Sequence, residues 1–291
     1  RKIVTGLDTP NNGIPSETGF VITPASEIMA VLCLSESLDE LRQKIDDMLL
    51  GYTFAGNGFT TKDLGVTGAI TALLKDAIQP NLVQTLEGTP AMIHGGPFAN
   101  IAHGCNSLMA TKTALQFGDY VVTEAGFASD LGAEKFFNIK CRKAGLQPAM
   151  SVLVATSQAL KLSGGATEKT MMLPDKETLK KGLRNLEKHI SIVKSFGQRV
   201  LVSLNKYHFD TEEELAYLRS WCAERDVHFA VNQSFSQGGA GAVEMAQAVV
   251  GRRVQHHREH HRQRAGRRQH QQRLPARIRR QAVAQPRERE G

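Results

Sequence analysis

Three stretches of the chain place glycines, histidines and small polar residues directly after an apolar run. They are Pro90–Ser107, Val121–Arg142 and Val152–Gly165. In a parallel α/β sheet, ligands bind in the loops that follow the carboxyl ends of the strands. Glycines there let the backbone approach a phosphate or carboxylate, and His, Asn, Glu and Lys supply polar contacts. The pattern predicts an enzyme site assembled from several strand ends.

The first stretch contains the residues best suited to proton transfer and anion binding. His94 and His103 bracket Gly95, Gly96 and Asn100. A histidine can accept a proton near neutral pH because its ordinary pKa lies there. Asn100 and the backbone amides of the glycine pair can donate hydrogen bonds to phosphate oxygens. Either histidine can instead be a structural hydrogen-bonding residue, and the sequence leaves the base unassigned.

The second stretch offers carboxylates for a cation. Glu124, Asp130 and Glu134 follow the apolar run Tyr120–Thr123, and carboxylate oxygens are ligands that Mg²⁺ accepts. Alternatively, Glu134 and Lys135 are solvated charges on a helix. Both interpretations remain open from the sequence.

Alternation of apolar runs with amphipathic segments indicates the fold. Short apolar runs bounded by Gly, Pro or Asn suit buried parallel strands, whereas apolar residues at helical spacing and capping residues indicate helices. This alternation predicts an α/β fold with a doubly wound parallel sheet flanked by helices and right-handed crossovers. The expected strands are Phe20–Thr23, Ala91–Ile93, Tyr120–Thr123, Val152–Ala155, Arg199–Leu204 and Val227–Val231, and the expected helices are Ser37–Leu50, Asp175–Phe196 and Thr211–Arg225.

The last 41 residues differ sharply in composition from the rest. Residues 251–291 contain thirteen Arg, three Glu and no Lys, so they account for more than the whole formal charge of +7. A segment this poor in large apolar residues is expected to be disordered. It is either a basic nucleic-acid-binding arm or the product of a shifted reading frame, which we favour. We therefore divide the chain into residues 1–250 and a tail, 251–291, and expect no nucleic-acid partner.

Motifs and cysteines exclude several classes of protein. GxxxxGK[ST], HExxH, GxSxG and GxGxxG are absent, so the chain encodes no phosphate-binding loop of its own. The cysteines Cys33, Cys105, Cys141 and Cys222 form no CxxC pair, which favours buried reduced thiols and a cytoplasmic protein. No apolar run approaches the ~20 residues of a membrane span. We expect no membrane partner.

Longer segments carry a more specific signal. GFVITPASEIMAVLCL (Gly19–Leu34), NLVQTLEGTPAMIHGGPFANIAHGCNS (Asn81–Ser107) and DYVVTEAGFASDLGAEKFFNIKCRKAGLQP (Asp119–Pro148) closely resemble formate–tetrahydrofolate ligases. The resemblance continues through LVATSQALKLSGG and FSQGGAGAVEMAQAVV and covers roughly residues 1 to 250. Members of that family are longer and carry their ATP phosphate loop upstream of the segment that resembles Arg1. The resemblance therefore implies an incomplete P-loop NTPase-like architecture and an internal fragment.

The resemblance also implies an activity. The family joins formate to tetrahydrofolate with ATP, through formyl phosphate, giving 10-formyltetrahydrofolate. Its ligands would be ATP, Mg²⁺, tetrahydrofolate and a monovalent cation, and its members are typically homo-oligomers in the cytosol. Without a phosphate loop, the isolated chain is predicted to be inactive. The alternative is a non-catalytic remnant that binds folate or a partner.

Site residues carry over where the motifs match. The family stacks the folate ring between two aromatic residues, and the matching positions are Tyr207, in LNKYHF, and Phe235, in NQSFSQGG. Flat rings bind well between aromatic faces. The family's usual residues there are Phe and Trp, so both positions differ in type but remain aromatic. Taken without the resemblance, Tyr207 is a loop aromatic and Phe235 a core residue.

The phosphate side of the site matches in part. Lys161, Gly164 and Gly165 fit the family pattern and are expected on the nucleotide side, with Gly95 and Gly96. Gln158 stands where the family has Arg. This difference removes a charge and the bidentate anion-binding geometry of a guanidinium.

Overall fold

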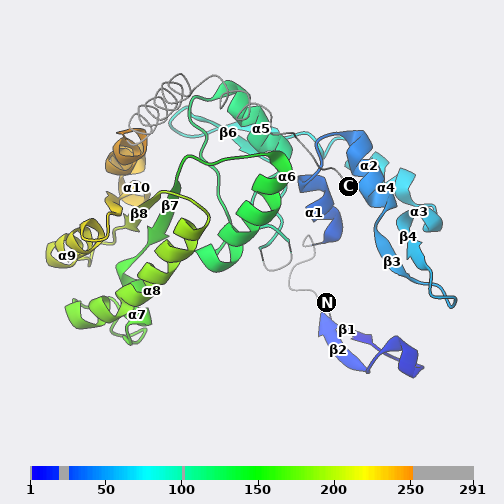
Figure 1. The fold of residues 1–291 in the computed structure, drawn as a ribbon, viewed down its shortest axis with the longest axis horizontal. Coiled ribbons are helices and arrows are strands. Elements are labelled where there is room, and N and C mark those ends of the chain that lie inside the picture. The colour runs from blue at the N-terminus through cyan, green and yellow to red at the C-terminus, as the bar shows by residue number, and fades with distance from the viewer. Residues whose placement is uncertain (1, 20–25, 100–101, 252–291) are drawn as a thin grey trace, which may run out of the picture. The chain divides into compact units, whose positions relative to one another are not determined.

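The computed structural model describes residues 2–19, 26–99 and 102–251 (Figure 1). The chain forms two compact units. The first comprises Arg1–Pro148 and Lys188–Gly197, and the second Ala149–Glu187 and Gln198–Gly291. The expected strand Phe20–Thr23, the candidate Asn100 and the tail beyond residue 251 lie outside the described residues.

The described strands of the first unit form three separate antiparallel hairpins. They pair β1 (Lys2–Thr5) with β2 (Ser16–Gly19), β3 (Leu49–Tyr52) with β4 (Gly58–Thr60), and β5 (Asn81–Gln84) with β6 (Pro90–Ile93). Glycine makes two of the turns possible. Gly56 and Gly88 both have a φ of +81°, and each donates its N–H to a threonine carbonyl three residues earlier. This left-handed turn favours glycine because it has no Cβ.

Four helices of the first unit, α1, α2, α3 and α5, begin at side-chain caps. Ser26, Ser37, Thr60 and Ser107 each accept a hydrogen bond from a backbone N–H in the first turn, which satisfies a donor that has no partner within the helix. The elements are α1 (Glu27–Cys33), α2 (Leu38–Asp46), α3 (Thr61–Leu64), α4 (Thr67–Leu74), α5 (Leu108–Phe117), the π-helical η2 (Ala128–Ala133) and η3 (Phe136–Cys141), and α6 (Arg142–Ala144); a 3₁₀ turn, η1 (Pro10–Asn12), lies between β1 and β2.

Two apolar clusters hold this unit together. Leu32, Leu41, Ile45 and Ile78 form the larger one, with α4 side chains packed against it. Cys105, Phe136 and Cys141 form the smaller one. The second cluster joins the loop before α5 to η3, so it fixes one wall of the cavity described below.

The second unit contains the parallel sheet. Its strands β7 (Ser151–Ala155), β8 (Val200–Asn205) and β9 (His228–Asn232) pair in parallel in the order β7-β8-β9. The helices are α7 (Ser157–Ser163), α8 (Lys176–Ser195), α9 (Glu212–Ala223) and α10 (Ser234–Gln237), followed by the 3₁₀ turn η4 (Gly238–Ala242). Residues 188–195 of α8 belong to the first unit. Residues 200–204 of the central strand are all buried, as expected of a strand covered on both faces. This α/β arrangement, with helices flanking a parallel sheet, confirms the predicted fold class.

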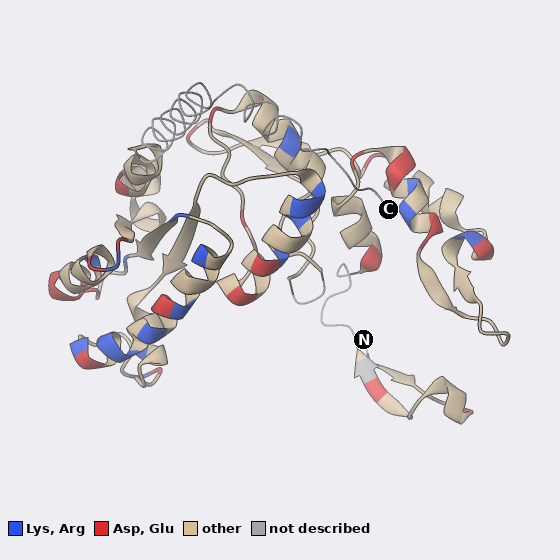
Figure 2. Ribbon diagram, in the orientation of Figure 1, with Lys and Arg blue, Asp and Glu red and all other residues tan. Residues whose placement is uncertain are grey.

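The predicted long helix is also confirmed. Its apolar positions Leu179, Leu183, Leu186, Ile190 and Val193 are all buried along α8. In Figure 2, basic and acidic residues are interspersed along the same helix. A helix with one apolar stripe and mixed surface charge is typical of a layer packed against a core. None of the helices in the described segments is both long and apolar enough to cross a membrane.

Four details differ from the sequence-based expectation. The helix expected at Ser37–Leu50 ends at Asp46, and Leu49 begins the strand β3. Ala91–Ile93 is a strand, but it pairs antiparallel in a hairpin with β5 instead of joining a parallel sheet. Tyr120–Thr123 is not a strand. The order of the parallel strands among the described residues does not reverse, so they show no doubly wound arrangement. Apolar runs bounded by turn residues reveal a strand or a buried segment, but the partner is set by contacts distant in sequence.

Candidate functional site

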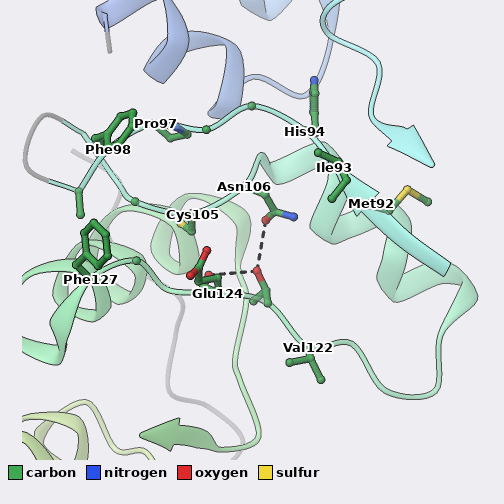
Figure 3. Close-up of a pocket in the computed structure, with 16 residues that line it drawn as sticks. Met92, Ile93, His94, Pro97, Phe98, Cys105, Asn106, Val122, Glu124 and Phe127 are labelled. Atoms are coloured by element: carbon green, nitrogen blue, oxygen red, sulfur yellow. Dashed lines mark hydrogen bonds between the residues drawn. The ribbon is translucent and has the colours of Figure 1, made fainter. Parts of the chain in front are cut away.

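A cavity of about 460 Å³ lies in the first unit (Figure 3). Three segments form its walls: the loop after β6, the turn before α5, and the extended segment before η2. Its lining residues are Met92, Ile93, His94, Gly95, Gly96, Pro97, Phe98, Ala99, Gly104, Cys105, Asn106, Val122, Thr123, Glu124, Gly126 and Phe127. The structure thus brings two of the three glycine-rich stretches together. A volume of this size is in the usual range for small-molecule sites.

Bare backbone defines the shape of the cavity. Gly95 has a φ of +67°, and a Cβ at this position would lie 2.1 Å from the Sγ of Cys33. A Cβ on Gly126 would lie 2.7 Å from the carbonyl oxygen of Gly104. Around Gly96, by contrast, a Cβ would meet nothing within 4 Å. Two close approaches therefore require glycine, whereas Gly96 borders open space where a ligand can approach its backbone.

His94 is buried and both of its ring nitrogens are engaged. Its Nε2 lies 2.7 Å from the carbonyl oxygen of Ala77, and its Nδ1 lies 2.5 Å from the Oγ of Ser107. A carbonyl only accepts, so Nε2 carries the proton and neutral Nδ1 accepts from the serine hydroxyl. Ser107 in turn caps α5. This geometry favours the structural interpretation of His94, since neither nitrogen is free for a substrate.

His103 has the opposite character. It is 1% exposed, and its Nε2 has no hydrogen-bond partner among the described residues. Burial, together with the nearby charges of Lys140 and Lys135, lowers the pKa of His103 to about 4. The imidazole is therefore neutral at pH 7. A buried neutral histidine with a free nitrogen keeps the capacity to accept a hydrogen bond, although its low pKa makes it a weak base.

The most unusual polar pair beside this cavity was not predicted from the sequence. Lys140 is completely buried, and its Nζ donates to the Oδ1 of Asn106 at 2.6 Å. No carboxylate lies within ion-pairing distance of Lys140 among the described residues. Burial lowers the pKa of Lys140, and nearby thiols oppose that shift. A possible signal was its place in Phe-Phe-Asn-Ile-Lys-Cys, where apolar neighbours on a helix predict burial.

Thiols near the cavity are not reactive nucleophiles. Burial raises the pKa of Cys33, Cys105 and Cys141 to about 11, so all three are protonated near neutral pH. All four cysteines are free and buried, as predicted. Their role is packing, because a thiol far from its pKa carries almost no thiolate.

Carboxylates at the cavity do not form a metal cage. Glu124 lines the cavity, but Asp130 does not. No group of three or more His, Cys, Asp or Glu side chains suited to a metal ion occurs among the described residues. Mg²⁺ that accompanies a nucleotide needs only one or two protein carboxylates beside phosphate oxygens and water. Glu124 therefore fits such a role better than Asp130.

Tyr207 and Phe235 both follow carboxyl ends of neighbouring strands in the second unit. Tyr207 comes two residues after Asn205 of β8, and Phe235 three residues after Asn232 of β9. Asn205 and Asn232 are register partners, and the Nδ2 of Asn232 donates to the Oδ1 of Asn205 at 3.0 Å. The two aromatics thus project from one edge of one sheet, where ligands bind in parallel α/β folds.

Exposure leaves both aromatic rings available. Phe235 is fully exposed and Tyr207 is 42% exposed, with its ring stacked on Phe209 at a centroid distance of 5.3 Å. Phe235 is therefore not a core residue. The carboxylate of Asp210 accepts from the backbone N–H of Tyr207 at 2.8 Å and from the hydroxyl of Ser157. Because Ser157 begins α7, this contact fixes the Tyr207 loop to the neighbouring strand-to-helix turn.

Lys161 lies inside the second unit. It is completely buried, its Nζ is 2.9 Å from the Oε1 of Glu214, and it also donates to the carbonyl oxygen of Leu173. A Cβ on Gly164 would lie 1.8 Å from the carbonyl oxygen of Thr178, so this glycine permits α7 and α8 to pack closely. Gly165 has a φ of +105°. These positions argue for structural roles in place of the expected nucleotide contacts.

The chain is similar in sequence to the members of one known family. The family model for formate–tetrahydrofolate ligase matches residues 1–283. Similar curated proteins include the formate–tetrahydrofolate ligases of Bacteroides thetaiotaomicron, Parabacteroides distasonis and Porphyromonas gingivalis, at 61%, 59% and 58% identity over 250 residues. Each alignment covers 86% of this chain and 45% of the relative, so the chain spans about half the length of these proteins. The chain belongs to the formate–tetrahydrofolate ligase family.

Proposed function

We propose that this chain supplies the folate-binding edge and one cavity of an ATP-dependent ligase that makes 10-formyltetrahydrofolate from formate and tetrahydrofolate. The observation that carries the proposal is the pair of exposed aromatics, Tyr207 and Phe235, at adjacent strand ends in a chain of this family. Solvent-exposed aromatic rings at a strand-end edge suit a flat pterin. Stacking on such rings contributes about 0.5–1.5 kcal/mol each beyond buried area.

The reaction would proceed in two steps. A formate oxygen attacks the γ-phosphorus of ATP and releases ADP, and the folate N10 then attacks the formyl carbon of formyl phosphate and releases phosphate and a proton. Phosphoryl transfer of this kind depends on positioning and charge stabilisation more than on covalent chemistry by the protein. Neither histidine is placed to contact the attacking amine, because both ring nitrogens of His94 are engaged and His103 Nε2 is sealed from solvent and outside the cavity lining. Asn100 remains a candidate donor.

Further ligands and assembly belong to the same proposal. Mg²⁺ would neutralise nucleotide charge, with Glu124 as the cavity carboxylate nearest to that role. By analogy with the family, we include in this proposal a monovalent cation, a homo-oligomeric complete enzyme and a cytoplasmic location. The sequence contains no Gly-Lys dipeptide and hence no GxxxxGK[ST] loop. We therefore expect no turnover from these 291 residues alone.

A coupled assay for 10-formyltetrahydrofolate tests this expectation. The isolated chain is incubated with formate, ATP, Mg²⁺ and tetrahydrofolate, and the full-length Bacteroides thetaiotaomicron ligase serves as the positive control. No product above background is expected from the chain. Appreciable turnover would contradict the expectation and show that these residues can bind the phosphates of ATP.

Folate binding separates a ligase segment or folate-binding remnant from a chain with no folate site. Titration calorimetry with tetrahydrofolate should show one saturable site that is weakened about 2- to 13-fold by Tyr207→Ala, the loss expected for one stacking contact. Tyr52→Ala is the matched control, because Tyr52 is an exposed tyrosine in the β3–β4 hairpin. Equal binding by wild type and Tyr207→Ala would remove Tyr207 from the site.

A further inference from the structure

Asn106 presents one half of its amide to the cavity and the other half to the protein interior. Its Oδ1 accepts from Lys140 Nζ at 2.6 Å and from the Thr111 hydroxyl at 3.1 Å, and the Thr123 hydroxyl lies 3.4 Å away. An ammonium group only donates, so the atom that faces Lys140 must be the oxygen. The amide orientation is therefore fixed by the lysine (Figure 3 labels Asn106 at the cavity).

This arrangement leaves Asn106 Nδ2 without a partner. Asn106 lines the cavity, and its Nδ2 donates no hydrogen bond to any of the described residues. Asn106 is partly exposed, so its side chain reaches the surface of the cavity that it lines. Two hydrogens of this amide are thus available to an acceptor from outside.

Local charge favours an acceptor that is anionic. Lys140 is a buried cation with no carboxylate within ion-pairing distance in the described segments, and its pull on Oδ1 polarises the amide so that Nδ2 becomes a stronger donor. The Lys135 ammonium contacts the carbonyl oxygen of Ala99, also on the cavity wall. Glu124, an exposed carboxylate, opposes these two cations. Two positive charges against one negative leave the cavity suited to a small anion.

We propose that Asn106 binds an anionic oxygen of the substrate, either carboxylate or phosphoryl, through Nδ2, and that Lys140 is the positioning residue that holds the amide in the binding orientation. This proposal refines the ligase function proposed above by assigning a contact for formate or for the phosphoryl group. It does not depend on turnover, because anion binding is measurable without it.

The test is a titration of the full 291-residue chain, labelled with ¹⁵N, followed through the side-chain NH₂ signal of Asn106. The signal is assigned by its disappearance in Asn106→Leu. Sodium formate and sodium phosphate are titrated separately against sodium chloride at matched ionic strength. A saturable shift of the Asn106 NH₂ signal is expected with one anion and not with chloride. The anion that causes it distinguishes a carboxylate subsite from a phosphoryl subsite.

Variants then separate contact from positioning. A hydrogen bond to a charged group corresponds to a loss of about 10- to 100-fold in affinity for Asn106→Leu, and Lys140→Met should weaken binding at least about 10-fold. Asn138→Leu is the matched control, because Asn138 is exposed in η3 and does not line the cavity. Thr111→Val removes one of the donors to Oδ1 and should have a smaller effect than Lys140→Met.

Each outcome decides the proposal. An Asn106 NH₂ signal that moves with neither anion, or Asn106→Leu binding as tightly as wild type, would overturn the contact. Unchanged affinity in Lys140→Met would overturn the positioning role. The wild-type titration needs no variant to fold, so misfolding of a variant does not shield the proposal. Anion binding without folate binding would contradict the ligase proposal and support the role of Asn106. Folate binding without anion binding would support the ligase proposal and contradict the role of Asn106.

Discussion

The buried ion pair between Lys161 and Glu214 gives the sharpest test of how the second unit is built. The two side chains are 0% and 3% exposed, and the pair distance is 2.9 Å. Glu214 also accepts from the backbone N–H of Asp175 at 3.0 Å, and Lys161 donates to the carbonyl oxygen of Leu173 at 2.9 Å. This network ties α7, the segment before α8 and α9 together. Removing the carboxylate leaves a buried ammonium without a counter-charge.

Glu214→Ala should therefore lower the free energy of unfolding by about 3–5 kcal/mol, the usual cost of breaking a buried pair by removing one partner. The matched control is Glu213→Ala on the same helix. Glu213 pairs with Lys176 at 2.8 Å, but the two side chains are 75% and 41% exposed. Solvent screens such a pair, so its loss should cost less than about 1 kcal/mol. The double variant Lys161→Met/Glu214→Leu should be more stable than Glu214→Ala alone, because no buried charge remains.

Urea unfolding followed by tryptophan fluorescence measures these differences. Trp221 is the single tryptophan of the chain, it is 7% exposed, and it lies in α9 of the same unit. Its signal therefore reports on this unit even if the other unfolds separately. A Glu214→Ala destabilisation no larger than that of Glu213→Ala would refute the reasoning and reopen a nucleotide contact for Lys161.

The same pair predicts a pH dependence. Burial raises the pKa of Glu214, but the hydrogen bonds from Lys161 and Asp175 outweigh it, so the pKa lies below its ordinary value. A depressed carboxyl pKa contributes stability above the unfolded value of about 4.3, and the contribution is lost as the pH falls through the folded value. In Glu214→Gln this loss of stability on acidification should be smaller than in wild type.

Three further perturbations test the first unit and the packing of helices. The pKa of His103 is about 4 in the folded protein, against an ordinary value of 6.5, so the folded state should lose roughly 3 kcal/mol of stability as the pH falls from 6.5 to 4. In His103→Gln, stability measured by circular dichroism should depend less on pH in this range. An unchanged slope would contradict the burial of the ring. Ser107→Ala removes the cap of α5 and the partner of His94, which should cost about 1–3 kcal/mol in thermal unfolding; a cost near zero would show that the network is not formed. Gly182→Ala would place a Cβ 1.7 Å from a backbone carbonyl oxygen of α7 and should lower the free energy of unfolding in urea by more than about 2 kcal/mol. The control is Gly68→Ala in α4, where a Cβ meets open space; this change should be neutral or stabilising by about 0.5–1 kcal/mol. Equal effects of the two substitutions would argue against the close contact between α7 and α8.

Local sequence predicted the second unit well. Val152–Ala155, Arg199–Leu204 and Val227–Val231 are strands within a residue or two of the expected bounds, and the helix expected at Asp175–Phe196 is α8. Strand–helix–strand succession with short loops leaves few alternatives to a parallel sheet. The caps expected at Ser37 and Thr211 also form.

The first unit was predicted less well, for an identifiable reason. Pro90–Ile93 has the composition of a buried parallel strand, yet a tight turn with Gly88 in the left-handed region returns it to Asn81–Gln84. The short apolar run Tyr120–Thr123 does not form a strand. Pairing is a property of two segments, so a single segment's composition cannot specify it.

The candidate site shows the same division. The sequence by itself determined the family, the glycine-rich segments that wall the cavity and the aromatic pair that follows adjacent strands, because these depend on residue identity and local order. Only the tertiary structure decided which polar groups are free. In the structure, both ring nitrogens of His94 are within hydrogen-bond distance of a partner, and Lys161 is buried in an ion pair with Glu214. Lys140 donates a hydrogen bond to the side-chain oxygen of Asn106. Whether a charged or polar group is available to a ligand depends on partners distant in the chain and on burial, and neither is encoded in the residue's own neighbourhood.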